Sequence, residues 1–150
     1  MTYDKLVSYF KEEKGIDTLI NDYKALFDQI DDIGQQLLQG IFSTSADFKS
    51  TLNFATGAYV SLEPLYSMAE AHKLNEELRH YVERKREAEA KGEKVVAASL
   101  EKEASLDVAD FRRIRNVLEG YVLSCEKIIV TCQTQLKRLE EEGKHKPLEE

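Results

Sequence analysis

The sequence has few of the residues that mark enzymes, metal-binding proteins or secreted proteins. It holds two cysteines and two prolines in 150 residues, and it lacks both a glycine-rich phosphate loop and a Ser or Cys nucleophile in a recognisable elbow. No apolar run approaches the roughly 18 residues that a membrane span needs. The first residues, MTYDKLVSYF, lack a basic stretch followed by an apolar signal core. We therefore expect a cytoplasmic protein (host cytoplasm if viral) that is not an enzyme and uses no cofactor.

The two cysteines are also poor candidates for a disulfide. Cys125 and Cys132 lie seven residues apart on one predicted helix, which separates them by about 10 Å along its axis. This distance is too long for a bond between them. We expect both to be reduced residues of the core.

Charge is abundant but uneven. The formal net charge is -7, and residues 1–40 hold eight acids and four bases, whereas residues 111–138 hold six bases and two acids. Residues 79–94, here called the basic tract, hold six bases against four glutamates. A basic face on an acidic protein can still bind a polyanion, with a strong dependence on salt.

The longest regular pattern runs from Phe111 to Leu139. Apolar or weakly polar residues recur there in steps of three and four without an intervening proline, which predicts one helix with a single buried stripe. A buried stripe of this length needs a partner helix of similar length. The residues of the stripe are Phe111, Ile114, Leu118, Tyr121, Cys125, Ile128, Cys132, Gln135 and Leu139.

Similar patterns predict the remaining helices. We expect helices near 3–14, 16–40, 46–92 and 95–142, which together form a single domain over residues 1–142, and a disordered tail at 143–150. Gly40 is expected to end the second helix. The outer face of that helix carries Asp28, Asp31 and Asp32, and we interpret it as a solvated acidic face rather than a cation site.

The segment 42–47, FSTSAD, is the clearest helix-start signal, and it predicts a helix that begins near Ser45. Pro64 lies inside that helix and is expected to kink or divide it, because proline lacks a backbone donor. Apolar residues occur on both faces around 54–68, which predicts a bundle interior or a subunit interface.

The charged segment 70–105 allows two interpretations. It forms either a projecting helical hairpin with its turn at Gly92 or a segment that becomes buried only in an oligomer, although residues 88–100 also permit one continuous helix. His72, Glu76 and His80 could share one helix face. They lack a fourth donor, so we predict no metal site.

The bases of this segment also allow two interpretations. Arg84, Lys85 and Arg86 could contact phosphates while Tyr81 stacks on a base. Alternatively they lie on an exposed helix with ion pairs such as Glu87 with Lys91. A second group, Arg112, Arg113 and Arg115, must be solvated or pair with acids such as Glu119 or the aspartates at 28, 31 and 32.

The order of these features resembles that of the UvsY-like recombination mediators of tailed phages. The resemblance covers about residues 54–139: an aromatic-rich helical segment (58–68), the basic tract, an acidic return EKEASLDVAD, and a final helix with Tyr121 and Cys125 one turn apart. It implies a ring-forming oligomer that binds single-stranded DNA and helps a recombinase filament displace single-strand-binding protein.

Only the basic tract carries residues over from that family. Arg84 and Arg86 match the position of the family's DNA-contacting bases, with Lys85 beside them. The candidate nucleic-acid-binding residues are Arg79, Arg84, Lys85, Arg86, Lys91 and Lys94.

The sequence therefore predicts an all-α protein, an elongated antiparallel bundle with long coiled-coil-like helices that forms a homo-oligomer. The leading functional hypothesis is a phage-type recombination mediator that binds single-stranded DNA and a recombinase. The alternative is a helical protein-binding module, namely an adaptor, an assembly scaffold or an inhibitor of a basic protein partner.

Overall fold

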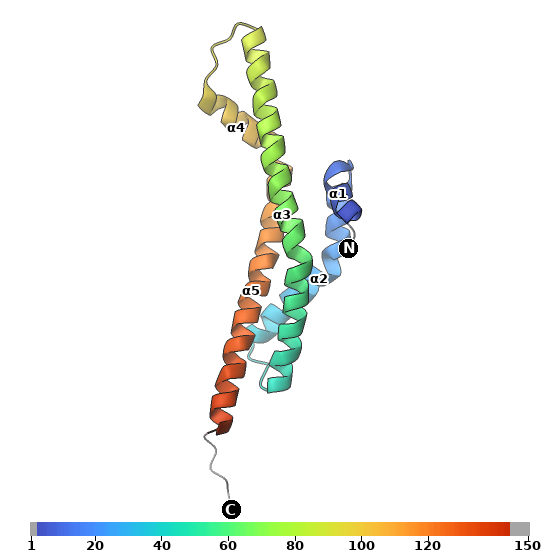
Figure 1. Ribbon diagram of the computed structural model, residues 1–150, viewed down its shortest axis with the longest axis vertical. Helices are drawn as coiled ribbons and strands as arrows, with labels where there is room; N and C mark the ends of the chain where they lie inside the picture. Colours follow the sequence, from blue (N-terminus) through green and yellow to red (C-terminus); the bar gives the residue numbers. More distant parts are fainter. Residues whose placement is uncertain (1–2, 145–150) are drawn as a thin grey trace, which may run out of the picture. The chain divides into compact units, whose positions relative to one another are not determined.

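The computed structural model describes residues 3–144, and these residues form five α-helices and no strand (Figure 1). The predicted all-α class is confirmed. Among the described residues no helix combines the length and the apolar character that a membrane crossing requires. The helices are α1 (Tyr3–Lys11), α2 (Gly15–Leu38), α3 (Ser45–Ala90), α4 (Ala97–Asp107) and α5 (Ala109–Lys144).

The described residues group into two compact units. The first unit joins the chain up to Ile16 with residues Pro64–Glu119, and the second joins Asp17–Glu63 with the chain from Gly120 onward. Both α3 and α5 contribute residues to each unit. The predicted single domain over residues 1–142 thus contains two units, each with its own core.

Each core is built from the apolar stripes of its helices. Burying these side chains away from water is the main favourable term in folding. The core of the first unit comprises Tyr9, Phe10, Leu65, Ala69, Leu100, Ala104, Val108, Ile114 and Leu118. The core of the second unit comprises Leu19, Phe27, Ile30, Phe48, Ala55, Ala58, Leu62, Val122, Cys125, Ile128 and Cys132. The predicted stripe of α5 is confirmed, since all of its members are buried or half-buried.

Glycine ends both α2 and α3, as predicted. Gly40 and Gly92 have φ values of 67° and 70°, a left-handed conformation that glycine adopts at no steric cost. After α2, the N–H of Ile41 donates to the Gln36 carbonyl at 3.1 Å, and after α3 the N–H of Glu93 donates to the Ala88 carbonyl at 3.0 Å. These bonds form Schellman motifs, which satisfy the last carbonyls of each helix.

A reciprocal cap begins α3 at Ser45, which confirms the predicted start. The N–H of Asp47 donates to Thr44 Oγ1 at 3.2 Å, and the N–H of Thr44 donates to Asp47 Oδ2 at 2.9 Å. This pairing is a capping box. Hydrogen bonds from Thr44 and Ser43 lower the pKa of Asp47.

The predicted helix over 95–142 is wrong, because the structure divides it into α4 and α5. Val108 separates them, with φ -104° and ψ 20°, and its side chain is fully buried. Arg112 Nη2 donates to the Ser105 carbonyl at 2.6 Å and also bonds the Ser105 hydroxyl. Burial of Val108 and this capping by arginine outweigh the local helix propensity of the sequence.

Two other boundaries differ from the predictions. The first helix ends at Lys11 rather than at residue 14. Of the two effects expected at Pro64, a kink or a division of the helix, the structure excludes the division, because α3 continues through Pro64, where the two units separate. Gly143 and Lys144 belong to α5, and the rest of the predicted tail lies outside the described residues.

Candidate nucleic-acid interface

The candidate bases lie on a helical hairpin of the first unit. α3 runs to Ala90, the chain turns at Gly92, and α4 returns beside α3 (Figure 1). Buried Leu100 and Ala104 attach α4 to the unit. Residues 70–107 are here called the α3–α4 hairpin, and the predicted turn at Gly92 is confirmed.

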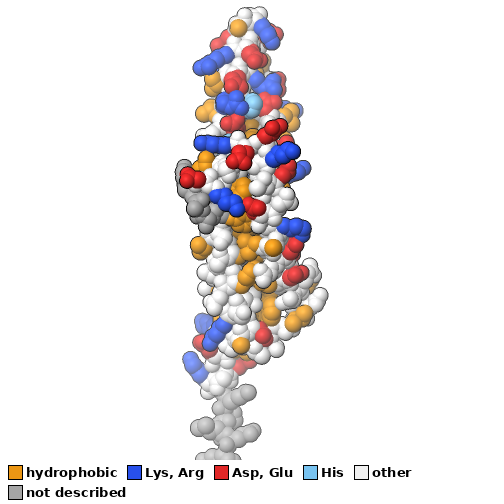
Figure 2. Space-filling model, turned by 90° about the vertical axis from the view of Figure 1, so that its right-hand side faces the viewer, with side chains coloured by type: hydrophobic (Ala, Val, Ile, Leu, Met, Phe, Trp, Pro, Cys, Tyr) orange, Lys and Arg blue, Asp and Glu red, His pale blue; other side chains and the backbone are white. Residues whose placement is uncertain are grey.

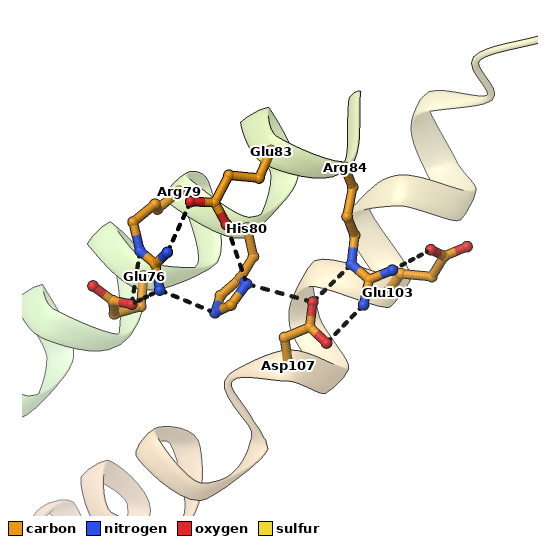
Figure 3. Close-up of polar contacts among 7 residues, drawn as sticks. All are labelled: Glu76, Arg79, His80, Glu83, Arg84, Glu103 and Asp107. Carbon is orange, nitrogen blue, oxygen red and sulfur yellow. Dashed lines mark hydrogen bonds and ion pairs between the residues drawn. The ribbon is translucent and has the colours of Figure 1, made fainter. Parts of the chain in front are cut away.

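Arg84 connects the two helices of the hairpin rather than projecting freely (Figure 3). Its Nε donates to Asp107 Oδ2 at 2.7 Å and its Nη2 donates to Oδ1 at 2.8 Å. Its Nη1 donates to Glu103 Oε2 at 2.9 Å. A two-pronged bond of this kind is the strongest form of arginine–carboxylate pairing. The Arg84 guanidinium lowers the pKa of Asp107, and Asp107 in turn raises the pKa of Arg84.

Arg79 is held on α3 by two glutamates. Its Nη2 donates to Glu76 at 2.6 Å, and its Nη1 donates to Glu83 at 2.8 Å. This arrangement lowers the pKa of Glu76. His80 Nδ1 lies 3.7 Å from Asp107 Oδ2 and 3.9 Å from Glu83 Oε2, so the polar contacts continue from α3 to α4 (Figure 3).

The other four candidate bases divide into two groups. Lys85 forms a long, exposed ion pair with Glu89 at 3.9 Å, which contributes little. Arg86, Lys91 and Lys94 form no side-chain ion pair or hydrogen bond with any described residue. The predicted pair of Lys91 with Glu87 is therefore not formed within the described part of the chain.

The hairpin as a whole is slightly acidic. Residues 70–107 hold ten acids and eight bases. On the face that Figure 2 shows, Lys and Arg side chains of the hairpin alternate with Asp and Glu and do not gather into one patch. Binding to phosphates without base specificity depends on a concentrated positive potential, and this face of the hairpin does not provide one.

Two of the three arginines at the start of α5 are also paired, whereas Arg113 is exposed and has no partner among the described residues. Arg115 Nη1 donates to Glu119 at 2.8 Å, the partner that the sequence suggests, and Nη2 lies 3.5 Å from Glu70. The Tyr66 hydroxyl donates to the same Glu119 at 3.2 Å. Arg112 bonds Ser105 and lies 3.9 Å from Glu77. These contacts hold α5 to α3 and α4 within the first unit.

His72 does not share a site with His80, because its ring is packed among aromatic side chains. The His72 ring lies between the rings of Phe10 and Phe111, with centroids 5.5 and 4.7 Å away, and burial lowers the pKa of His72. Among the described residues no group of three or more His, Cys, Asp or Glu side chains could hold a metal ion.

Sequence reasoning missed the acidic partners of the hairpin. Glu103 and Asp107 lie 19 and 23 residues from Arg84, and no local spacing rule joins residues that far apart. The signal that could have found them is the turn at Gly92, because a hairpin that closes there places the acids of the returning helix beside the basic tract.

Comparisons with protein-family models, curated proteins and solved structures find no match for this chain. The assignment of function therefore depends on the geometry and on the charges of the described residues.

Proposed function

We propose that this chain is a non-catalytic helical protein-binding module whose acidic helix α2 engages a basic partner protein. The observation that carries the proposal is the excess of negative charge on this helix. Helix α2 holds five acids and one base. An excess of one sign on one element steers a partner of the opposite sign and favours its association.

Three exposed carboxylates of α2 are accessible to a partner, namely those of Asp28, Asp31 and Asp32. Among residues 3–144, Asp28 pairs only with Lys24, through a contact in which the side chains of Asp28 and Lys24 are 59% and 67% exposed, and such pairs contribute little stability. Asp31 accepts one hydrogen bond from the Tyr121 hydroxyl at 3.0 Å. Asp32 is exposed and forms no ion pair with a described residue. Basic side chains of a partner could approach all three.

The α3–α4 hairpin favours this function over the DNA-binding one. A phosphate that approached Arg79 or Arg84 would have to displace a carboxylate already at 2.6 to 2.9 Å. The displaced carboxylates would then lie beside the phosphate and repel it. Arg84, one of the two arginines that the resemblance places on DNA, is therefore already occupied within the fold, and so is Arg79.

The test compares one peptide with one oligonucleotide by fluorescence anisotropy. The peptide is a labelled amphipathic helix with Leu at steps of three and four and Lys on one flank, and the oligonucleotide is oligo-dT. We expect the peptide to bind and the oligonucleotide not to bind at physiological salt. A scrambled peptide of the same composition controls for charge alone.

A charge-matched pair of variants locates the interaction. The variant Asp28→Asn, Asp31→Asn, Asp32→Asn should weaken peptide binding about tenfold, or about 1.4 kcal/mol. The control variant Glu87→Gln, Glu89→Gln, Glu93→Gln removes three charges from the hairpin, and we expect it to change the affinity for the peptide little. Equal affinities of the two variants would contradict the proposal.

A second candidate function retains single-stranded DNA as the ligand. The observation that favours it is the lack of intramolecular partners for Arg86, Lys91 and Lys94. A homo-oligomer of a recombination mediator would repeat these three bases on each subunit, which compensates for weak binding by one subunit.

Light scattering with oligo-dT at increasing salt tests this candidate. The candidate function requires an oligomer. The logarithm of its affinity should fall linearly with the logarithm of the salt concentration, and the three contacts of each bound subunit should contribute about -2 to the slope. Replacing Arg86, Lys91 and Lys94 by alanine should remove the binding, whereas replacing Lys49, Lys127 and Lys137 should not. No binding at low salt would exclude the mediator function.

A further inference from the structure

An open groove lies between α2 and α5 in the second unit. Its volume is ≈ 660 Å³. Apolar side chains from both helices line it, Ile30 and Leu37 from α2 and Leu123 from α5. Leu123 is 49% exposed, so part of the apolar lining of the groove is in contact with water.

A glycine lies in one wall of this groove. Gly34 lies on the groove wall of α2, and a Cβ placed there would meet no atom within 4 Å. Glycine in a helix interior costs about 0.5–1 kcal/mol relative to alanine, and no packing of the described chain explains its presence here. The missing side chain leaves room for a segment that approaches closely.

The two walls of the groove carry opposite charges. Asp31 lines it from α2, and Asp28 lies one helical turn before Asp31. Lys127 lines the opposite wall from α5 and forms no ion pair with a described residue. The groove thus has an apolar floor, an acidic edge and a basic edge.

We propose that this groove binds one amphipathic helix of a partner protein, with the apolar stripe of that helix on the floor. Its basic flank lies along Asp28 and Asp31 of α2, and its neutral or acidic flank faces Lys127. Two helical walls with apolar side chains between them accept anchors at steps of three and four. This inference rests on the proposed function and adds where the partner binds and in what form.

The first test fills the groove. A Cβ at Gly34 would meet no atom within 4 Å, so we expect Gly34→Leu to place a side chain in the groove with the fold retained and to raise the helix propensity of α2. Gly57→Leu is the matched control, because Gly57 is an exposed helical glycine of the same unit that also has no atom within 4 Å of its Cβ position. We expect Gly34→Leu to weaken binding of the amphipathic peptide about tenfold or more, and Gly57→Leu to leave it within about twofold.

The second test changes one edge of the groove. The probe is a peptide with Lys on one flank and Glu on the other. Lys127→Glu places an acid opposite the Glu flank, so it should weaken binding several-fold, whereas Lys137→Glu, which does not line the groove, should have a smaller effect. A Lys127→Glu variant that binds this peptide as tightly as Lys137→Glu does would contradict the predicted orientation of the partner's two flanks.

Two results would overturn the groove assignment while leaving the proposed function in place. One is a Gly34→Leu variant that binds as the unchanged chain does while the Asp28, Asp31, Asp32 variant still loses affinity. The other is a dimer of the free protein, seen by sedimentation, that Gly34→Leu dissociates, because a second copy would then occupy the groove. If the unchanged chain binds no peptide, the proposed function fails as well.

Discussion

Arg84 of α3 donates two nearly parallel hydrogen bonds to Asp107 at the end of α4, at 2.7 and 2.8 Å. One of the two arginines that the resemblance places on DNA therefore connects the two helices of the hairpin. Its neighbour Arg86, two positions along the same helix, has no such partner among the described residues. The two arginines provide a matched comparison of a structural role and a binding role.

Replacing Arg84 should destabilise the protein, whereas replacing Arg86 should not. Arg84→Ala leaves Asp107 and Glu103 without their common partner, so it should lower the Tm clearly more than Arg86→Ala. Arg84→Lys should recover only part of the loss, because lysine cannot form the two-pronged bond. Thermal unfolding followed by circular dichroism measures all three, and equal Tm values for Arg84→Ala and Arg86→Ala would contradict the structural role.

The stability should depend on pH through His72. Burial lowers its pKa from 6.5, so the unfolded chain binds a proton at a higher pH than the folded chain does. The contribution of neutral His72 to the free energy of unfolding is fully present above about pH 6.5. It is lost as the pH falls from there through the lower pKa of His72 in the folded state. Glu76 is the charged group that opposes this shift.

The variant His72→Phe tests this dependence. Phenylalanine keeps a ring between Phe10 and Phe111 but does not titrate, so the free energy of unfolding should fall less between pH 7 and pH 5 than in the unchanged chain. Urea unfolding at both pH values measures the difference. An equal fall in both proteins would show that other groups cause it.

Both cysteines should be unreactive in the folded protein. Burial raises the pKa of Cys125 to about 11, and it raises the pKa of Cys132 as well. At pH 8 a thiol of that pKa is about a hundredfold less ionised than an ordinary one. We expect the two thiols of the folded protein to react with a chromogenic disulfide reagent more than about a hundredfold more slowly than the thiols of the unfolded protein. Rapid reaction of the folded protein would show that the core of the second unit opens readily.

Two residues of α3 test the packing of the second unit. Leu62 is fully buried, and Leu62→Ala should lower the free energy of unfolding by about 2–5 kcal/mol. Val60 is 65% exposed, and Val60→Ala should change the free energy of unfolding by less than about 0.5 kcal/mol. Chemical denaturation measures both values, and similar losses would mean that Val60 is covered in solution, for example by another copy of the chain.

The sequence predicts those features of the fold that depend on local patterns. The steps of three and four from Phe111 to Leu139 correctly predict which face of α5 is buried, and the residues around Ser45 and Gly92 correctly predict a helix start and a turn. The break at Val108 is not predictable in this way, because the burial of one valine and the bond from Arg112 to Ser105 cause it.

The candidate site is predictable only in part, for the same reason. The basic tract is visible in the sequence, but the acids that neutralise Arg84 lie 19 and 23 residues away and reach it only when the hairpin closes. The groove between α2 and α5 joins residues about 90 positions apart, as the bond from Tyr121 to Asp31 shows. No local pattern indicates that Gly34 leaves a space rather than weakening a helix.

The most direct test of the central claim is a proton–nitrogen correlation NMR spectrum of the isotope-labelled chain, recorded with the amphipathic peptide and then with oligo-dT. We predict that the peptide shifts amide signals on the two groove walls, including those of Gly34 and Leu123, and that oligo-dT at physiological salt leaves the spectrum unchanged. Oligo-dT shifts that cluster at Arg86, Lys91 and Lys94, with no response to the peptide, would contradict a protein-binding function and support the mediator.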